Sequence, residues 1–340
     1  TAISSLNEGA KMGNFAHNTG EGGISDYHLK GGDLIWQIGT GYFGCRDGKG
    51  HFNDALFVEK ANLKEVKMIE IKLSQGAKPG HGGLLPAEKN TPEIARIRAL
   101  EPHKTVHSPS AHTAFSNAIE LLHFIQKLRN LSNGKPVGFK ICIGKKEEFT
   151  EIIEAMLNTN ILPDFITIDG AEGGTGAAPL EFIDYMGMAL SDALVFAHKS
   201  LVDYGLRSEI KILASGKIIS AFDIAKNMSL GADVCYSARG MMFALGCIQA
   251  LQCDSGKCPV GIATQDKSLY KGLDITDKRV RVANFHKNTL KAVAEFIGAC
   301  GFESPDQVTA ETFFRRVNYN TNLNFKEIYF TNPETKNKTL

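Results

Sequence analysis

Short apolar runs that end in glycine-rich turns recur along the chain. Each run has about four to seven β-branched or apolar residues, ends in Gly, Ser, Thr or Lys, and leads into a segment with helical spacing. The six clearest runs lie at 34–44, 68–83, 137–144, 165–177, 210–217 and 232–240. A shorter run that ends at 17–23 adds a seventh. This pattern predicts seven strands, each followed by a loop at its carboxyl end.

Amphipathic helices alternate with these runs. The spacing of apolar residues predicts helices at 114–128, 147–157, 192–204 and 221–228. Near-continuous apolar strands that alternate with helices indicate a parallel sheet covered on both faces, so the fold class is α/β. Seven or eight such units in one chain favour a (β/α)8 TIM barrel, and an open, doubly wound sheet is the alternative.

The sequence at the two ends of the chain predicts where the barrel begins and ends. Residues near the start (ISSLNEGAKMG) have a helical pattern, so we expect the first barrel strand to lie upstream of residue 1. We expect the barrel to occupy 1–317, including a cysteine loop at 247–258, and 318–340 to form an Asn- and Thr-rich tail. One segment of that tail, at 325–330, is predicted to dock.

Composition narrows the class of protein. The 340 residues are 43% hydrophobic, and 38 basic residues balance 37 acidic ones, which argues against disorder and against a nucleic-acid-binding surface. No apolar run approaches the roughly 20 residues of a membrane span, and the N-terminus lacks a signal-peptide pattern. We therefore expect a cytoplasmic protein, although an anchor upstream of residue 1 stays compatible with the sequence. A homo-oligomer is equally compatible.

Glycine and cysteine counts point to chemistry. The chain has 34 Gly, one residue in ten, which suggests that backbone must approach something closely. Its seven Cys form an odd number, so a reducing compartment or a metal site is a better interpretation than a disulfide framework.

The glycine-rich loops are predicted to converge, because the carboxyl ends of barrel strands form one mouth. The turns at 215–217 (SGK) and 238–240 (ARG) follow the last two predicted strands, where barrels commonly bind phosphate. The loop at 169–177 (DGAEGGTGA) lets a flat ligand approach, and it is not a GxGxxG fingerprint. A phosphorylated cofactor fits this arrangement, and simple tight turns are the alternative.

Cations are predicted at the same mouth. Lys72, Lys78 and Lys140 lie near strand ends, and Arg98 lies on the helix that follows Pro92. Such groups hold carboxylates or phosphates, or stabilise negative charge on a ring. For any one of them alone, a solvated salt bridge is an equal alternative.

Cys247, Cys253 and Cys258 fall within twelve positions, and Pro259 follows the third. Three thiolates suit an iron–sulfur cluster with three irons, whereas zinc needs a fourth ligand from elsewhere, such as Cys300 or His286. Buried core cysteines are the plain alternative. A second cluster of possible ligands, His103, His107 and His112, is interrupted by prolines and is interpreted as loop histidines.

The longest motifs resemble a known family. The stretches IEIKLSQGAKPGHGGLLPAEK, IARIR, DGAEGGTGAAPLEF and CPVGIATQ are together similar to the FMN-binding domain of glutamate synthase. The chain most resembles stand-alone glutamate synthase-like proteins that lack a glutaminase domain, from about residue 14 to about residue 300. The resemblance implies a (β/α)8 barrel that holds FMN, with a 3Fe-4S cluster on Cys247, Cys253 and Cys258.

The resemblance also implies a reaction and a set of roles. Ammonia and 2-oxoglutarate would form 2-iminoglutarate, to which reduced FMN delivers a hydride to give glutamate. Lys78 and Arg98 would hold the substrate carboxylates, and Glu21 and Thr40 would line the same pocket. The cofactor would be bound by Gln75 and Lys140 at the flavin ring, and by Gly173, Gly174, Ser215, Gly216, Ala238 and Arg239 around ring, ribityl chain and phosphate.

One departure bears on the substrate. Leu84 stands where glutamate synthases have a Gln that contacts 2-oxoglutarate, a loss on the order of 1 to 3 kcal/mol, so a related 2-oxo acid is an alternative substrate. Expected partners are the 2-oxo acid, ammonia or an amine, and an electron donor such as ferredoxin or a reductase subunit. Another FMN-dependent barrel reductase, or a truncated electron-relay or structural fragment, are the alternative functions.

Overall fold

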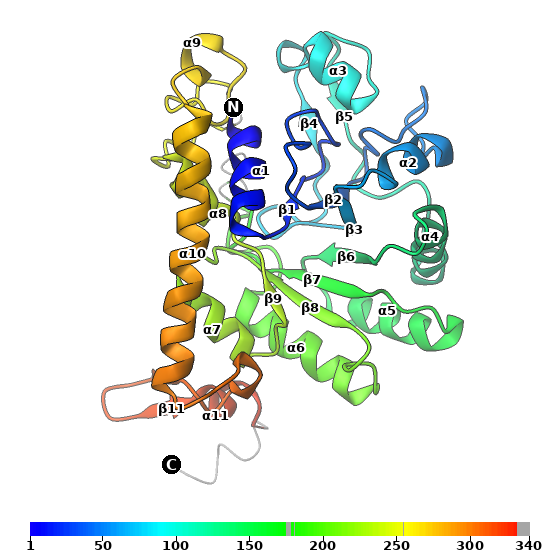
Figure 1. Cartoon of the computed structure of the whole chain (residues 1–340). Helices are drawn as coiled ribbons and strands as arrows, with labels where there is room; N and C mark the ends of the chain where they lie inside the picture. Colours follow the sequence, from blue (N-terminus) through cyan, green and yellow to red (C-terminus); the bar gives the residue numbers. More distant parts are fainter. Residues whose placement is uncertain (175–177, 180, 254, 332–340) are drawn as a thin grey trace.

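A single curled sheet of seven parallel strands forms the centre of the protein (Figure 1). The computed structural model describes residues 1–174, 178–179, 181–253 and 255–331. Within them the strands follow one another across the sheet in chain order. They are β1 (His17–Asn18), β2 (Leu34–Ile38), β3 (Val66–Lys72), β6 (Val137–Ile141), β7 (Phe165–Asp169), β8 (Lys211–Ser215) and β9 (Val234–Cys235).

These strands form because their apolar runs are covered on both faces. Every residue of β2 and β7 is buried, as expected for a parallel sheet under helices. The covering helices lie outside the curled sheet: α2 (Asp54–Ala61), α4 (Ala118–Leu131), α5 (Lys146–Thr159), α6 (Leu190–Asp203), α7 (Ala221–Ser229) and α8 (Ala238–Leu245). The α/β class and the parallel order confirm the predicted fold, and the curl of the sheet is that of a TIM barrel. In the described part of the chain, the sheet is open between β1 and β9.

Two further helices pack side by side across that opening (Figure 1). Helix α1 (Ala2–Gly13) covers the stretch with the predicted helical pattern and has Thr1 as its N-cap. Helix α10 (Ile275–Ala299) is a long helix that the sequence pattern did not predict. Their approach depends on a glycine, because a Cβ on Gly9 would lie 2.5 Å from Val282 Cγ1. Among the described residues, no helix combines the length and apolar character that crossing a membrane requires.

Two segments of the chain lie outside the seven-stranded sheet. After β3 the chain forms the antiparallel pair β4 (Leu84–Leu85) and β5 (Val106–His107), with η1 (Ala87–Lys89) and α3 (Pro92–Arg98) between them. After β9 and α8 it passes through α9 (Lys267–Tyr270) to α10.

The C-terminal part docks against the barrel. It contains η2 (Pro305–Gln307), the antiparallel pair β10 (Phe314–Arg316) and β11 (Asn322–Asn324), and α11 (Phe325–Tyr329). Phe325 is buried in the main core cluster, so the predicted docked segment is present. The domain boundary at residue 317 stays a prediction, and 332–340 of the predicted tail lie outside the described residues.

Candidate functional site

A pocket opens at the carboxyl ends of the first strands, where the barrel mouth was predicted. Because all seven strands are parallel, their following loops meet at this one edge. The described residues that line the pocket include Glu21, Thr40, Lys72, Gln75, Lys78 and His81. Glu21, Thr40, Gln75 and Lys78 are residues to which the resemblance assigned a role, and Lys72 was predicted as a cation at this mouth.

An ion pair between Lys72 and Glu21 forms one wall of this pocket. Lys72 is the last residue of β3 and is buried, with its Nζ 3.1 Å from Glu21 Oε1. The same ammonium donates a hydrogen bond of 2.6 Å to Gln75 Oε1. Burial lowers the pKa of Lys72, and the charge of Glu21 opposes this shift. Burial would raise the pKa of Glu21, but Lys72, Lys140 and Lys78 outweigh it and hold this pKa below its usual value.

Arg98 adds a further positive charge beside Glu21. It lies at the end of α3, with its guanidinium 4.9 Å over the ring of Phe43. A Cβ on Gly22 would lie 3.2 Å from Arg98 Nη2, so the chain next to Glu21 runs directly past this side chain. Burial lowers the pKa of Arg98 and the charge of Glu21 opposes the shift. With several cations around one carboxylate, the pocket favours an anionic ligand.

The predicted cofactor loops are in contact with one another. A Cβ on Gly76 would fall 1.7 Å from the carbonyl oxygen of Gly170, which only two bare backbones allow. A Cβ on Gly173 would lie 3.0 Å from Gly216 Cα, so the turns after β7 and β8 also touch. Gly174 and Gly216 both have positive φ (133° and 137°), a conformation that favours glycine. Residues 175–177 of the predicted loop lie outside the described residues.

The turns after β8 and β9 present backbone groups at the same mouth. Ser215 ends β8, and its carbonyl oxygen accepts from the Gly170 N–H at 2.9 Å. Helix α8 begins at Ala238, with Arg239 in its first turn. The N-cap residue Ser237 donates its hydroxyl to Ile218 O instead of accepting from the helix, and in the described chain no side chain caps this helix. Its first N–H groups therefore suit an anion.

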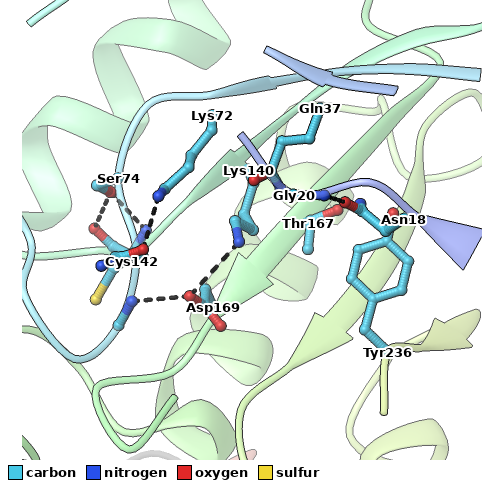
Figure 2. A network of polar contacts seen from close by, with 12 residues as sticks. Asn18, Gly20, Gln37, Lys72, Ser74, Lys140, Cys142, Thr167, Asp169 and Tyr236 are labelled. Carbon is cyan, nitrogen blue, oxygen red and sulfur yellow. Dashed lines mark hydrogen bonds and ion pairs between the residues drawn. The ribbon is translucent and has the colours of Figure 1, made fainter. Parts of the chain in front are cut away.

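A buried carboxylate that the sequence reasoning missed holds the turn that carries Glu21 in place. Glu70 on β3 is fully buried, and its carboxylate accepts four hydrogen bonds. The donors are Gln37 Nε2 (2.5 Å), Thr167 Oγ1 (2.6 Å), Asn18 Nδ2 (2.9 Å) and Tyr236 OH (3.2 Å). These four donor residues are labelled in Figure 2. Asn18 Oδ1 in turn accepts from the Gly20 N–H at 2.9 Å. The network therefore fixes the turn that carries Glu21.

His112 is the second residue whose role was missed. It is buried, with Nε2 2.9 Å from Lys72 O and Nδ1 3.0 Å from Tyr42 OH. A carbonyl only accepts, so Nε2 carries the proton and Nδ1 accepts from the tyrosine. Burial lowers the pKa of His112 to about 4, so the ring is neutral near pH 7. His112 thereby fixes the end of β3, from which Lys72 extends. His103 lies in a turn and His107 on β5.

The three clustered cysteines have different environments. Cys258 is buried, Cys247 is half-buried and accepts from the Gln249 N–H at 3.4 Å, and Cys253 is exposed. Burial would raise the pKa of Cys258, but backbone N–H groups at 260–263 outweigh it and lower this pKa. Across the described residues, which omit residue 254, no group of three or more His, Cys, Asp or Glu side chains gathers to hold a metal ion. Within that described part, the three thiols therefore do not gather into a ligand set for a cluster.

The other two residues considered as zinc ligands have different surroundings. Cys300 is exposed at the end of α10, and His286 stacks on Phe15 with ring centroids 4.2 Å apart. Leu84 is 61% exposed on β4 and, in the described part of the chain, does not line the pocket.

Comparisons with known proteins show the family and the fold of this chain. The family model described as "Conserved region in glutamate synthase" matches residues 1–303. The glutamate synthase large subunit-like protein YerD of Bacillus subtilis (strain 168) is 44% identical over 312 residues, which cover 91% of this chain and 59% of the relative. The archaeal glutamate synthase (NADPH) of Methanocaldococcus jannaschii is 36% identical over 288 residues, which cover 84% of this chain and 53% of that relative. The chain thus spans a little over half the length of these curated relatives.

Among solved structures, a mutant flavocytochrome b2 with pyruvate bound superposes with a TM-score of 0.53 at 12% identity. The match covers 99% of this chain and 70% of that one. At this identity the likeness shows the fold alone.

Proposed function

The chain belongs to the family defined by the conserved region in glutamate synthase, and we propose that it is the FMN-binding, substrate-binding part of a glutamate synthase-type oxidoreductase. The reaction proposed is reductive amination of 2-oxoglutarate, or of a related 2-oxo acid, to the amino acid. The single observation that carries this proposal is the cationic pocket around Glu21, placed directly beside the glycine-lined turns at one barrel mouth.

The residues present fit FMN. The bare backbones at Gly76, Gly170, Gly173 and Gly216 let the turns after β3, β7 and β8 pack together, which brings the predicted FMN-binding loops to one mouth. The free N–H groups that open α8 suit its phosphate. In this arrangement Gln75 and Lys140 would face the ring, Gly173 and Gly174 would lie along it, and Ser215, Gly216, Ala238 and Arg239 would hold the ribityl phosphate. When bound and reduced, FMN supplies a hydride donor.

In this proposal, different pocket side chains would bind different groups of a 2-oxo dicarboxylate. Lys78 and Arg98 would bind its two carboxylates by charge-assisted hydrogen bonds, with Thr40 beside them. Glu21 stays ionised because the neighbouring lysines lower its pKa, so its carboxylate would stabilise the positive charge on an imine nitrogen. Lys72 holds Glu21 in position. Leu84 does not line the pocket in the described part of the chain, so the alternative of a related 2-oxo acid rests on the sequence difference at this position alone.

Three further parts of the proposal rest on the family resemblance: a 3Fe-4S cluster on Cys247, Cys253 and Cys258, delivery of electrons by a ferredoxin or a reductase subunit, and ammonia supplied free or by another chain. The proposed cytoplasmic location rests on the sequence, in which we found neither a long apolar run nor a signal-peptide pattern. The described thiols do not gather into a ligand set, and the roles proposed for the pocket residues do not depend on the cluster.

The test uses the purified 340-residue chain, prepared anaerobically and then titrated with FMN. With dithionite, ammonium and 2-oxoglutarate we expect glutamate to form, measured by chromatography. Arg98→Gln should lower kcat/KM by about tenfold or more, because it removes a charge-assisted hydrogen bond. Arg96→Gln is the matched control, since Arg96 lies on the same helix but pairs with Asp26 at the surface.

The outcomes separate the alternatives. FMN binding without glutamate favours a reductase that acts on another substrate, and no FMN binding favours a structural or electron-relay fragment. Iron and sulfide analysis of the same preparation tests the cluster, whose absence would remove that part of the proposal alone.

A further inference from the structure

Asp169 joins three strands of the barrel through one oxygen atom. It is the last residue of β7, it is buried, and its Oδ2 accepts a 2.8 Å hydrogen bond from the Gly76 N–H. The same Oδ2 lies 4.0 Å from Nζ of Lys140, which is on β6. Figure 2 shows Asp169 between the turn that follows β3 and the Lys140 side chain.

Burying the Asp169 carboxylate costs free energy that its partners must offset. A buried charge is costly unless it is paired and hydrogen-bonded, and Asp169 meets this condition with one cation and one backbone donor. Among the described residues, the charges that act on Lys140 include this carboxylate, that of Glu21, and the ammonium of Lys72, its register partner on the neighbouring strand β3. Asp169 is the acid that forms an ion pair with the Lys140 ammonium, so it bears on both the position of that ammonium and the net charge around it.

We propose that Asp169 is a positioning residue that holds the Lys140 ammonium and the Gln75–Gly76 turn in place beside the flavin ring, and that its carboxylate partly offsets the Lys140 charge there. The inference rests on the proposed function, because it needs FMN at this mouth. It goes further by assigning two separable roles to one acid: an acceptor for Gly76 and a counter-charge for Lys140.

The two roles predict different results for two substitutions. Asp169→Asn keeps an acceptor for the Gly76 N–H but removes the negative charge. The ammonium then acts on the ring with less opposition, so negative charge on reduced FMN is stabilised and the reduction potential of bound FMN shifts to a more positive value. Asp169→Ala removes both roles, and the turn that follows β3 loses its anchor.

The other end of the same strand offers a matched control. Asp164, directly before β7, uses its Oδ2 in the same way: it accepts from the Val137 N–H at 2.8 Å and pairs with Arg129 at 2.9 Å. Asp164→Asn and Asp164→Ala therefore make the same chemical change at the amino end of β7, away from the mouth at its carboxyl end. They measure what is lost when an aspartate that binds a backbone N–H and a cation on the same strand is replaced, without touching the proposed role.

The first measurement needs no FMN. Hydrogen exchange of the peptide that contains Gly76 is followed by mass spectrometry in the wild type and in all four variants. Asp169→Ala should accelerate exchange there by about tenfold, whereas Asp169→Asn and both Asp164 variants should stay near the wild type. Exchange that Asp169→Ala leaves unchanged would overturn the anchoring role. If the Ala variant fails to fold, the Asn variant still tests the charge.

The second measurement is the reduction potential and Kd of FMN. For Asp169→Asn we expect a positive shift of the potential with a Kd within about threefold of the wild type, and for Asp169→Ala a Kd raised about tenfold. A shift in Asp169→Asn no larger than that in Asp164→Asn would overturn the charge role. If the wild type binds no FMN, the proposed function fails with it, and the exchange result still decides the anchoring of the turn.

Discussion

Lys72 and Glu21 each owe their ionisation to the other. A lysine as buried as Lys72 is disfavoured in its charged form, and a half-buried carboxylate is disfavoured as well. Their 3.1 Å separation, together with the 2.6 Å bond from Lys72 to Gln75, compensates both. The negative charge on Glu21 and the positive charge on Lys72 therefore depend on each other, and removing either residue changes both.

Removing one partner tests this dependence. Glu21→Gln leaves the Lys72 ammonium buried without a counter-charge, so we expect the free energy of unfolding to fall by about 1 to 3 kcal/mol, a value reduced because Glu21 is partly exposed. Urea unfolding at pH 7 measures it. The matched control is Glu59→Gln, which breaks an exposed Lys–Glu pair and should cost less than about 1 kcal/mol. Equal losses in the two variants would contradict the account.

The sequence predicted the positions of the charged residues in this pocket but not the pairings between them. It placed Lys72, Lys78, Lys140 and Arg98 at one mouth, because strand ends and loop positions follow from local pattern. It did not find that Glu21 pairs with Lys72 or that Glu70 gathers four donors, because such contacts depend on the register between distant strands. The available signal was local: an acid in the middle of the apolar run MIEIK.

At the scale of elements, strands were predicted better than helices. Apolar runs give the strands directly, and the observed β3 and β7 lie close to the predicted runs. Helix α4 starts at Ala118, not at 114, because the Asn117 side chain caps the Glu120 N–H. Helix α10 was missed, since its apolar residues are spread among many charged ones and its burial comes from contact with α1, α7 and α8.

The close contact between α1 and α10 predicts that a larger residue at Gly9 destabilises the fold. Gly9→Ala places a Cβ against Val282 Cγ1 and within 2.9 Å of the Arg279 carbonyl oxygen, so the helices must move apart. We expect a loss of about 1 to 3 kcal/mol in the free energy of unfolding, measured with urea.

The control for this substitution lies on α10 itself. A Cβ on Gly298 meets nothing within 4 Å among the described atoms, so Gly298→Ala should stabilise the protein by about 0.5 to 1 kcal/mol through helix propensity alone. If both Gly→Ala variants are stabilised, α1 and α10 are not packed as closely as described.

At the scale of the whole molecule, buried histidines link folding to pH. Burial lowers the pKa of His17 to about 4, that of His28 to about 3 and that of His112 to about 4, all from an ordinary value of 6.5. In the unfolded chain each ring titrates near 6.5, so below that pH the unfolded state binds more protons than the folded state. The free energy of unfolding must therefore fall as the pH drops.

The expected window runs from about pH 6.5 down to about pH 4, where the folded rings begin to titrate. Each histidine adds a slope of up to about 1.4 kcal/mol per pH unit inside that window. Glu21, whose folded pKa is lowered, adds to the loss only below about pH 4.5, because its stabilisation is complete above its unfolded value. Urea unfolding at pH 7.5, 6.5, 5.5 and 4.5 measures the curve.

A single-histidine variant separates this effect from general acid sensitivity. His112→Gln keeps a donor for Lys72 O but removes one titrating ring, so its stability should be lower at pH 7.5 and its slope between pH 6.5 and 4.5 shallower by up to about 1.4 kcal/mol per pH unit. The exposed His123→Gln should keep the wild-type slope. If His112→Gln keeps that slope too, His112 is not held neutral in the folded state. The ring that fixes the end of β3 would then carry charge beside Lys72, and the electrostatic balance of the pocket would have to be assigned differently.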